Sequence, residues 1–206
     1  MPAFQSWNES RTAFVQAARW FAATTRLVAD RWDEPGLGEW DIRALTGHTS
    51  RALLTAETYL ARPTAAVELR SPAEYVVATH DAAGGGAVTD RGRQAGLALG
   101  HDPSQTVSEI VERITRLLAP CAGTELVDTL VGGMRLRDYL PTRTFELVVH
   151  TSDICRALGI PANPPKDAAR QTLSLVSELA LERDGASELL LAATGRTQLP
   201  EGFTVL

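Results

Sequence analysis

The sequence predicts an all-α fold in which four or more helices pack as a bundle. Apolar residues recur at helical spacing through most of the chain, whereas segments with the alternating pattern of strands are few. Short breaks rich in glycine and proline separate the helical stretches. The 206 residues are 44% hydrophobic and 22% charged, which is typical of a globular protein that can bury its own core. These features together favour a helical bundle.

The helical stretches can be placed by their end signals. Helices are expected over about residues 8–32, 41–62, 71–83, 87–99, 102–118, 135–158, 167–185 and 186–195. Asn8 or Ser10 would cap the first helix, Asp41 would cap the second, and Gly159 would end the long sixth one. Pro141 lies in the first turns of that long helix, whose regular part could begin there instead. The glycine-containing segment 123–138 is the least helical and is expected to form an extended excursion or a short hairpin.

The chain divides into two expected parts. Residues 1–160 would form the bundle, and residues 161–206 would form a short C-terminal helical extension packed on it. The amphipathic helix over 167–185 could cover the bundle or form a homodimer contact.

The composition indicates which kinds of partner and which cellular compartment to expect. The net charge of -5 and the pI near 5.4 argue against nucleic acid and acidic membrane surfaces as main partners, because both attract basic patches. No apolar run approaches the roughly 20 residues that cross a bilayer, and no signal peptide is apparent. A cytoplasmic protein with reduced cysteines is therefore expected, and Cys155, in a helical apolar pattern, is expected in the core.

The stretch "TFELVVHTSD" carries the first candidate site. Glu146 and His150 are four residues apart and share one helix face. Arg143 and Asp153 extend this polar stripe in both directions, and apolar residues flank it on both sides. Taken by themselves, Glu146 and His150 could form an ion pair on the surface. A narrow polar seam inside a bundle would instead need charged partners or a metal.

His48 is the second candidate. It shares a helix face with small and apolar residues, and no acidic residue lies three or four positions from it. As a core residue it would still need a polar partner, which must then come from another helix. Two histidines and one glutamate on facing helices would supply three ligands and leave one position open, as in catalytic zinc sites. His80 and His101 are expected at helix ends or in loops.

Two segments resemble a known family. "GLGEWDIRALTGHTSRALLTAE" and "RTFELVVHTSDICRALG" resemble the mycothiol-dependent maleylpyruvate isomerase N-terminal family, within the DinB/YfiT-like metalloenzyme superfamily. The resemblance extends to about residue 160 and implies a DinB-like four-helix bundle with extra C-terminal helices. It also implies a divalent metal, most commonly zinc, held by His48, Glu146 and His150.

The resemblance also implies a chemistry. A metal-activated thiol, mycothiol as cosubstrate, would attack an electrophilic small molecule, giving S-transfer (detoxification) or cis-trans isomerisation. Arg143 is a candidate anchor for a substrate carboxylate or an ion-pair partner of Glu146, and Asp153 is a candidate orienting group for His150. The sequence departs from the family pattern at Ala44, where many relatives carry an acidic residue. Only about 50 residues follow His150, too few for the separate C-terminal domain of full-length isomerases, so S-transfer is favoured over isomerisation. The alternative is a non-enzymatic bundle that binds a metal or another ligand.

Overall fold

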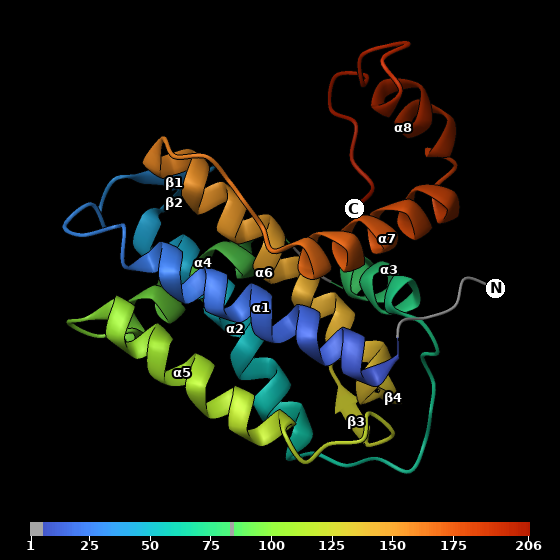
Figure 1. The fold of residues 1–206 in the computed structure, drawn as a ribbon, viewed down its shortest axis with the longest axis horizontal. Coiled ribbons are helices and arrows are strands. Elements are labelled where there is room, and N and C mark those ends of the chain that lie inside the picture. Colours follow the sequence, from blue (N-terminus) through green and yellow to red (C-terminus); the bar gives the residue numbers. More distant parts are fainter. Residues whose placement is uncertain (1–5, 83–84) are drawn as a thin grey trace.

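The computed structural model describes residues 6–82 and 85–206, and helices dominate it (Figure 1). The helices are α1 (Trp7–Thr25), α2 (Ile42–Leu60), α3 (Pro72–Ala82), α4 (Gly85–Ala98), α5 (Pro103–Leu118), α6 (Leu136–Leu158), α7 (Lys166–Glu182) and α8 (Ala186–Ala193). The strands form two small antiparallel hairpins, β1 (Pro35–Leu37) with β2 (Trp40–Asp41) and β3 (Leu126–Thr129) with β4 (Gly132–Arg135). The expected all-α, DinB-like bundle with extra C-terminal helices is confirmed.

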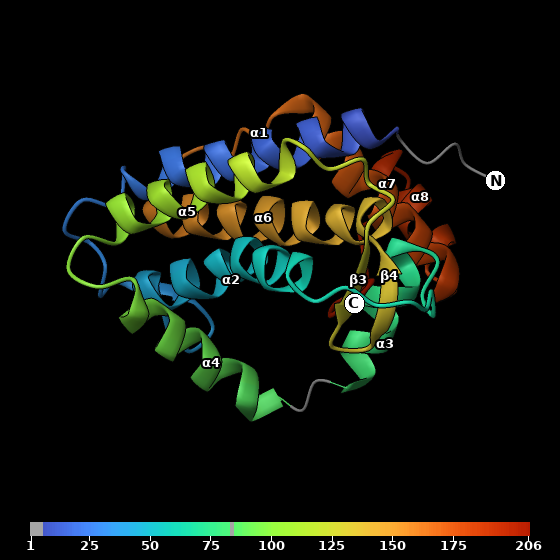
Figure 2. The ribbon, with the colours of Figure 1, turned by 90° about the horizontal axis from the view of Figure 1, so that it is seen from below.

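Four helices make the bundle. In order around it they are α1, α6, α2 and α5, each in contact with its two neighbours. Figure 2 shows their long axes running in broadly the same direction. The core between them is apolar and aromatic, and its fully buried side chains include Phe14 and Phe21 of α1, Leu45 of α2 and Leu147 of α6. Removing such side chains from water is the main stabilising contribution to the fold.

The first helix differs from the prediction at both ends. Its cap is Ser6, not Asn8 or Ser10, and Ser6 and Glu9 form a reciprocal capping box. This spacing of three fits the capping-box pattern, which places Asn8 and Ser10 inside the first turns. The helix ends at Thr25 instead of continuing to residue 32, because the chain tightens into turns that bury Val28.

The start of α2 follows the prediction. Asp41 caps the helix, and its Oδ1 accepts a hydrogen bond from the Ala44 amide at 2.6 Å. The glycine-rich break before it forms the β1–β2 hairpin, which the sequence did not reveal. The hairpin places Trp40 directly before the cap, so this indole lies beside the first turns of α2.

The segment before α6 is a short hairpin, one of the two predicted forms. β3 and β4 pair in register from Leu126–Arg135 to Thr129–Gly132. α6 then begins at Leu136, continues through Pro141, and ends at Gly159, whose φ of 70° is the left-handed conformation that glycine adopts without strain.

Helix α4 packs on α2 at very short range. A Cβ added at Gly47 would lie 2.0 Å from the backbone nitrogen of Gly96, so glycine allows the two backbones to meet. In Figure 2, α4 lies against α2 on the side away from α5 and α1. This contact lies one residue from His48 and fixes the position of that turn of α2.

The C-terminal segment packs on the bundle through α7, which contacts α6, α1 and α3. α8 has no buried residue and contacts α7 (Figure 1). The division at residue 160 into a bundle and an extension stays a prediction. Cys121 and Cys155 are both free thiols, and Cys155 is buried as expected. Within the described residues, no helix combines the length and the apolar character that a membrane-crossing helix requires.

Candidate metal centre

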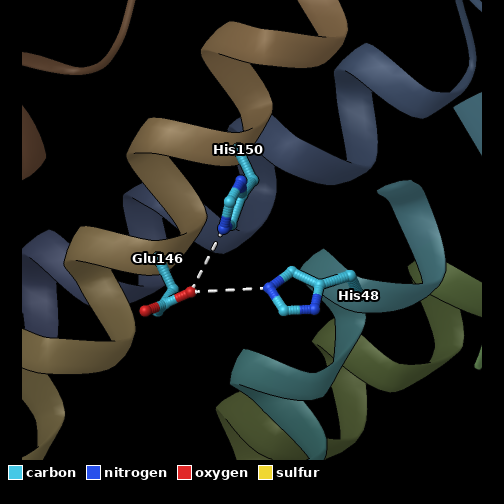
Figure 3. Close-up of side chains that lie close together, drawn as sticks. All are labelled: His48, Glu146 and His150. Atoms are coloured by element: carbon cyan, nitrogen blue, oxygen red, sulfur yellow. Dashed lines mark ion pairs between the residues drawn. The ribbon is translucent and has the colours of Figure 1, made fainter. Parts of the chain in front are cut away.

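Two neighbouring helices of the bundle bring His48, Glu146 and His150 together. Figure 3 shows the His48 side chain reaching from α2 toward the other two on α6. One carboxylate oxygen, Oε2 of Glu146, lies 3.3 Å from Nε2 of His150 and 3.9 Å from Nε2 of His48. The two imidazoles meet edge to face, with their centroids 4.8 Å apart. The helix spacing thus aims both Nε2 atoms at a single acceptor.

These three side chains are largely shielded from water. The exposed fractions of the side chains are 18% for His48, 29% for Glu146 and 17% for His150. A surface ion pair, the simplest interpretation of Glu146 and His150 from sequence, does not describe this arrangement. The pair instead faces another helix, and His48 finds there the acidic neighbour that its own helix lacks.

Asp153 supports His150 from the opposite side of the ring. Its Oδ2 lies 3.3 Å from Nδ1 of His150, and its other oxygen pairs with Arg156 at 3.3 Å. In the neutral ring, a proton on Nδ1 that is donated to Asp153 would leave the lone pair of Nε2 available to a metal. This carboxylate–histidine arrangement is the usual support for a histidine that binds a metal.

The neighbouring charges set different protonation states for the three groups. Burial and the nearby His150 charge lower the pKa of His48 to about 4. Burial would lower the pKa of His150 as well, but hydrogen bonds to Asp153 and Glu146 raise it to about 9. Burial opposes ionisation of Glu146, yet the hydrogen bond from His150 and the Arg143 charge lower its pKa to about 2. At neutral pH the metal-free cluster therefore holds a carboxylate, an imidazolium and a neutral imidazole.

Arg143 makes no ion pair with Glu146. Its guanidinium carbon lies 5.3 Å from the ring centroid of Tyr75 and 5.1 Å from that of Tyr139, and its Nε donates to Thr142 at 3.0 Å. Within the described part of the chain, no carboxylate lies within 4.0 Å of it. The guanidinium is thus held by two aromatic rings, one turn of α6 from Glu146, and among the described residues its terminal NH₂ groups have no hydrogen-bond partner.

The donor set fits a divalent cation such as zinc. The ligand atoms of His48, Glu146 and His150 all lie within 4.8 Å of one another. Metal–ligand bonds of about 2.0–2.2 Å in a tetrahedral site separate neighbouring ligand atoms by roughly 3.3 Å. The distance between Nε2 of His150 and Oε2 of Glu146 already has this value. The His48 side chain would have to move toward the other two, because its Nε2 lies 3.9 Å from Oε2 of Glu146 and the three ligand atoms are spread over up to 4.8 Å. Two imidazoles and one carboxylate also leave a fourth position open.

Sequence reasoning missed the aromatic residues around the cluster. Trp40 stacks on His48, with ring centroids 4.5 Å apart and an angle of 31° between the planes. Tyr139 precedes Arg143 by four residues on α6, a spacing that could have indicated their contact, whereas Tyr75 comes from α3 and its contact with Arg143 has no signal in the spacing of the sequence. His80, in the last turn of α3, and His101, just before α5, are exposed at helix ends as predicted.

These observations define a class of protein: a helical bundle with a largely buried cluster of two histidines and one glutamate between two of its helices. A comparison with protein families matches residues 13–155 to the mycothiol maleylpyruvate isomerase N-terminal domain. The chain therefore belongs to that family, whose description links it to mycothiol-associated enzymes. No match was found among curated proteins or among solved structures.

Proposed function

We propose that the protein is a zinc-dependent enzyme that uses a small thiol, mycothiol, as cosubstrate. The observation that carries this proposal is the convergence of His48, Glu146 and His150 from two helices, with a fourth position open. A metal bound there would lower the pKa of a thiol in the open position, so that thiolate is available at neutral pH. Membership of a mycothiol-associated family supports the choice of thiol.

The protein's own side chains prepare the site. Asp153 would accept the Nδ1 proton of His150, so that Nε2 becomes the ligand atom once its own proton has left. Glu146 contributes the negative charge that balances a divalent cation better than neutral ligands would. Because the three side chains are largely shielded, these electrostatic interactions are stronger than they would be in water.

Arg143 is the proposed anchor for an anionic group of the substrate. The Tyr75 and Tyr139 rings hold its guanidinium in place, so little side-chain freedom is lost when an anion binds. A guanidinium fork can pair with a carboxylate through two parallel hydrogen bonds. Its place one turn before Glu146 would set such a group beside the cluster.

The proposed reaction is nucleophilic attack by the thiolate sulfur on an electrophilic carbon. In S-transfer, a carbon–sulfur bond forms while the leaving group departs with its electron pair. In isomerisation, the sulfur adds to an activated double bond, the resulting single bond rotates, and elimination of the thiolate restores the double bond in the other geometry. We favour S-transfer, and isomerisation is the second possibility within the same chemistry.

The test combines metal analysis with a thiol-transfer assay. Purified protein should contain about one zinc per chain, and with mycothiol and monochlorobimane it should form the fluorescent conjugate faster than buffer does. Glu146→Gln should lose both properties, whereas His80→Gln, at an exposed helix end, should keep both. Stoichiometric metal without any rate above background would instead indicate a metal-binding protein that is not an enzyme of this kind.

A further inference from the structure

The two candidate histidine ligands are supported in different ways. Asp153 faces Nδ1 of His150 across the ring from Glu146. Nδ1 of His48, by contrast, is buried and has no hydrogen-bond partner among the described residues. Because metal-binding histidines usually donate this second N–H to an acceptor, something else must hold the His48 ring.

The group that contacts the His48 ring is Trp40. The two rings are nearly stacked, with centroids 4.5 Å apart and planes 31° from parallel. The torsion angle about the Cβ–Cγ bond of histidine has a broad distribution, so a ring without a polar partner can rotate unless its neighbours restrict it. The indole on one side and the His150 ring, whose centroid lies 4.8 Å from that of His48 at nearly a right angle, restrict that rotation.

Trp40 is itself fixed by α4. Its indole Nε1 donates to the Thr89 carbonyl at 3.0 Å. The indole lies against Gly92, where an added Cβ would come 2.7 Å from Cε2, an atom that its two rings share. One turn further on, Gly96 lies against the backbone of α2. The indole is thus clamped between α4 and the imidazole, and its plane is set by contacts on both sides.

We propose that Trp40 is a positioning residue that orients the His48 ring for metal binding through stacking, in place of a hydrogen-bonding partner. This inference rests on the proposed function for the metal, but it also predicts a property of the metal-free protein. Without the indole, the His48 ring should sample more than one orientation, and part of the population would no longer direct Nε2 at the cluster. The His150 ring, which Asp153 holds, should be unaffected.

The experiment compares Trp40→Phe, which keeps an aromatic face, with Trp40→Leu, which does not. Trp20→Leu is the matched control, because Trp20 is also partly buried against the core but has no ring contact with the cluster. Cobalt(II) affinity, measured by chelator competition, should fall about tenfold in Trp40→Leu and less than threefold in Trp40→Phe. A tenfold loss is at the low end of what is usual when a residue that orients a metal ligand is removed. The d–d absorption band of bound cobalt should shift in Trp40→Leu alone.

A purely structural role for Trp40 would give a different result. Affinity losses in Trp40→Leu no larger than those in Trp20→Leu, or equal losses in Trp40→Phe and Trp40→Leu, would overturn the proposal. If Trp40→Leu does not fold, Gly92→Ala displaces the indole while keeping it in the chain, and it should reproduce the affinity loss. Unchanged cobalt affinity in folded Gly92→Ala protein would also overturn the proposal.

Measurements on metal-free protein separate this inference from the proposed function. In the wild type, nuclear Overhauser contacts between the His48 ring and the indole should define one ring orientation, and in Trp40→Leu the His48 ring should show several. A wild type that binds no cobalt but shows one fixed orientation would count against the metal site only. A His48 ring that samples several orientations in the wild type would refute the role of Trp40.

Discussion

The proton on His150 should compete with a metal for Nε2, so metal affinity should rise steeply with pH. The pKa of His150 is raised to about 9, whereas those of His48 and Glu146 are lowered to about 4 and about 2. Above pH 6 only His150 must therefore lose a proton when the metal binds. At pH 7 the ratio of imidazolium to imidazole is about 100 to 1, and at pH 9 it is about 1 to 1.

The size of the effect follows from this ratio. Between pH 7 and pH 9 the apparent association constant should rise by about (1 + 100)/(1 + 1), or roughly 50-fold, equivalent to about 2.3 kcal/mol. A histidine with the ordinary pKa near 6.5 would give a rise of only about 1.3-fold over the same range. The two cases are far enough apart for a simple titration to distinguish them.

The assay is cobalt(II) titration of the metal-free protein by visible absorption, with a chelator as competitor and constant ionic strength. Asp153→Asn removes one of the two carboxylates that stabilise the His150 cation, so its affinity should level off at a lower pH. His80→Gln should follow the wild-type curve. A rise of less than threefold between pH 7 and pH 9, or an Asp153→Asn curve identical to the wild type, would refute the charge distribution described for the cluster.

Three further predictions concern stability. Gly47→Ala should lower the free energy of unfolding by about 1–3 kcal/mol in chemical denaturation, because its Cβ would clash with the Gly96 backbone. Asp41→Ala should cost about 1 kcal/mol by the same measurement, since the Ala44 amide loses its acceptor. Metal-free protein should lose up to about 3 kcal/mol as the pH rises from 6.5 through 9, because the raised pKa of His150 stabilises the fold only while the ring is protonated. Thermal melts at each pH should show this loss in the wild type and not in His150→Gln.

Exposed positions provide controls for these stability measurements. Thr58 lies on the exposed face of α2, so Thr58→Ala should change the free energy of unfolding by no more than about 0.5 kcal/mol. A Gly47→Ala protein as stable as Thr58→Ala would show that α4 can move away from α2 at little cost. Equal stability of the wild type at pH 6.5 and pH 9 would contradict the assignment of a charged His150.

Local chemistry made several elements predictable. Asp41 and Gly159 mark the ends of their helices because capping depends on a few neighbouring backbone groups, which the sequence specifies. The first helix was predicted too long, because periodicity continues past Thr25 while the buried turn at Val28 is decided by packing. The β1–β2 hairpin was missed, since its strands are only three and two residues long.

The sequence alone determined which side chains share a face. The 3.6-residue period aligns Glu146 with His150, and it leaves His48 without an acidic neighbour on its own helix. Tertiary structure decided what these faces meet. His48 lies opposite Glu146, and Trp40 stacks on His48. Arg143 lies against Tyr75 and Tyr139 instead of pairing with the Glu146 carboxylate. The physical reason is that helical periodicity is a local property of one segment, whereas the neighbour across the bundle depends on how all the helices pack.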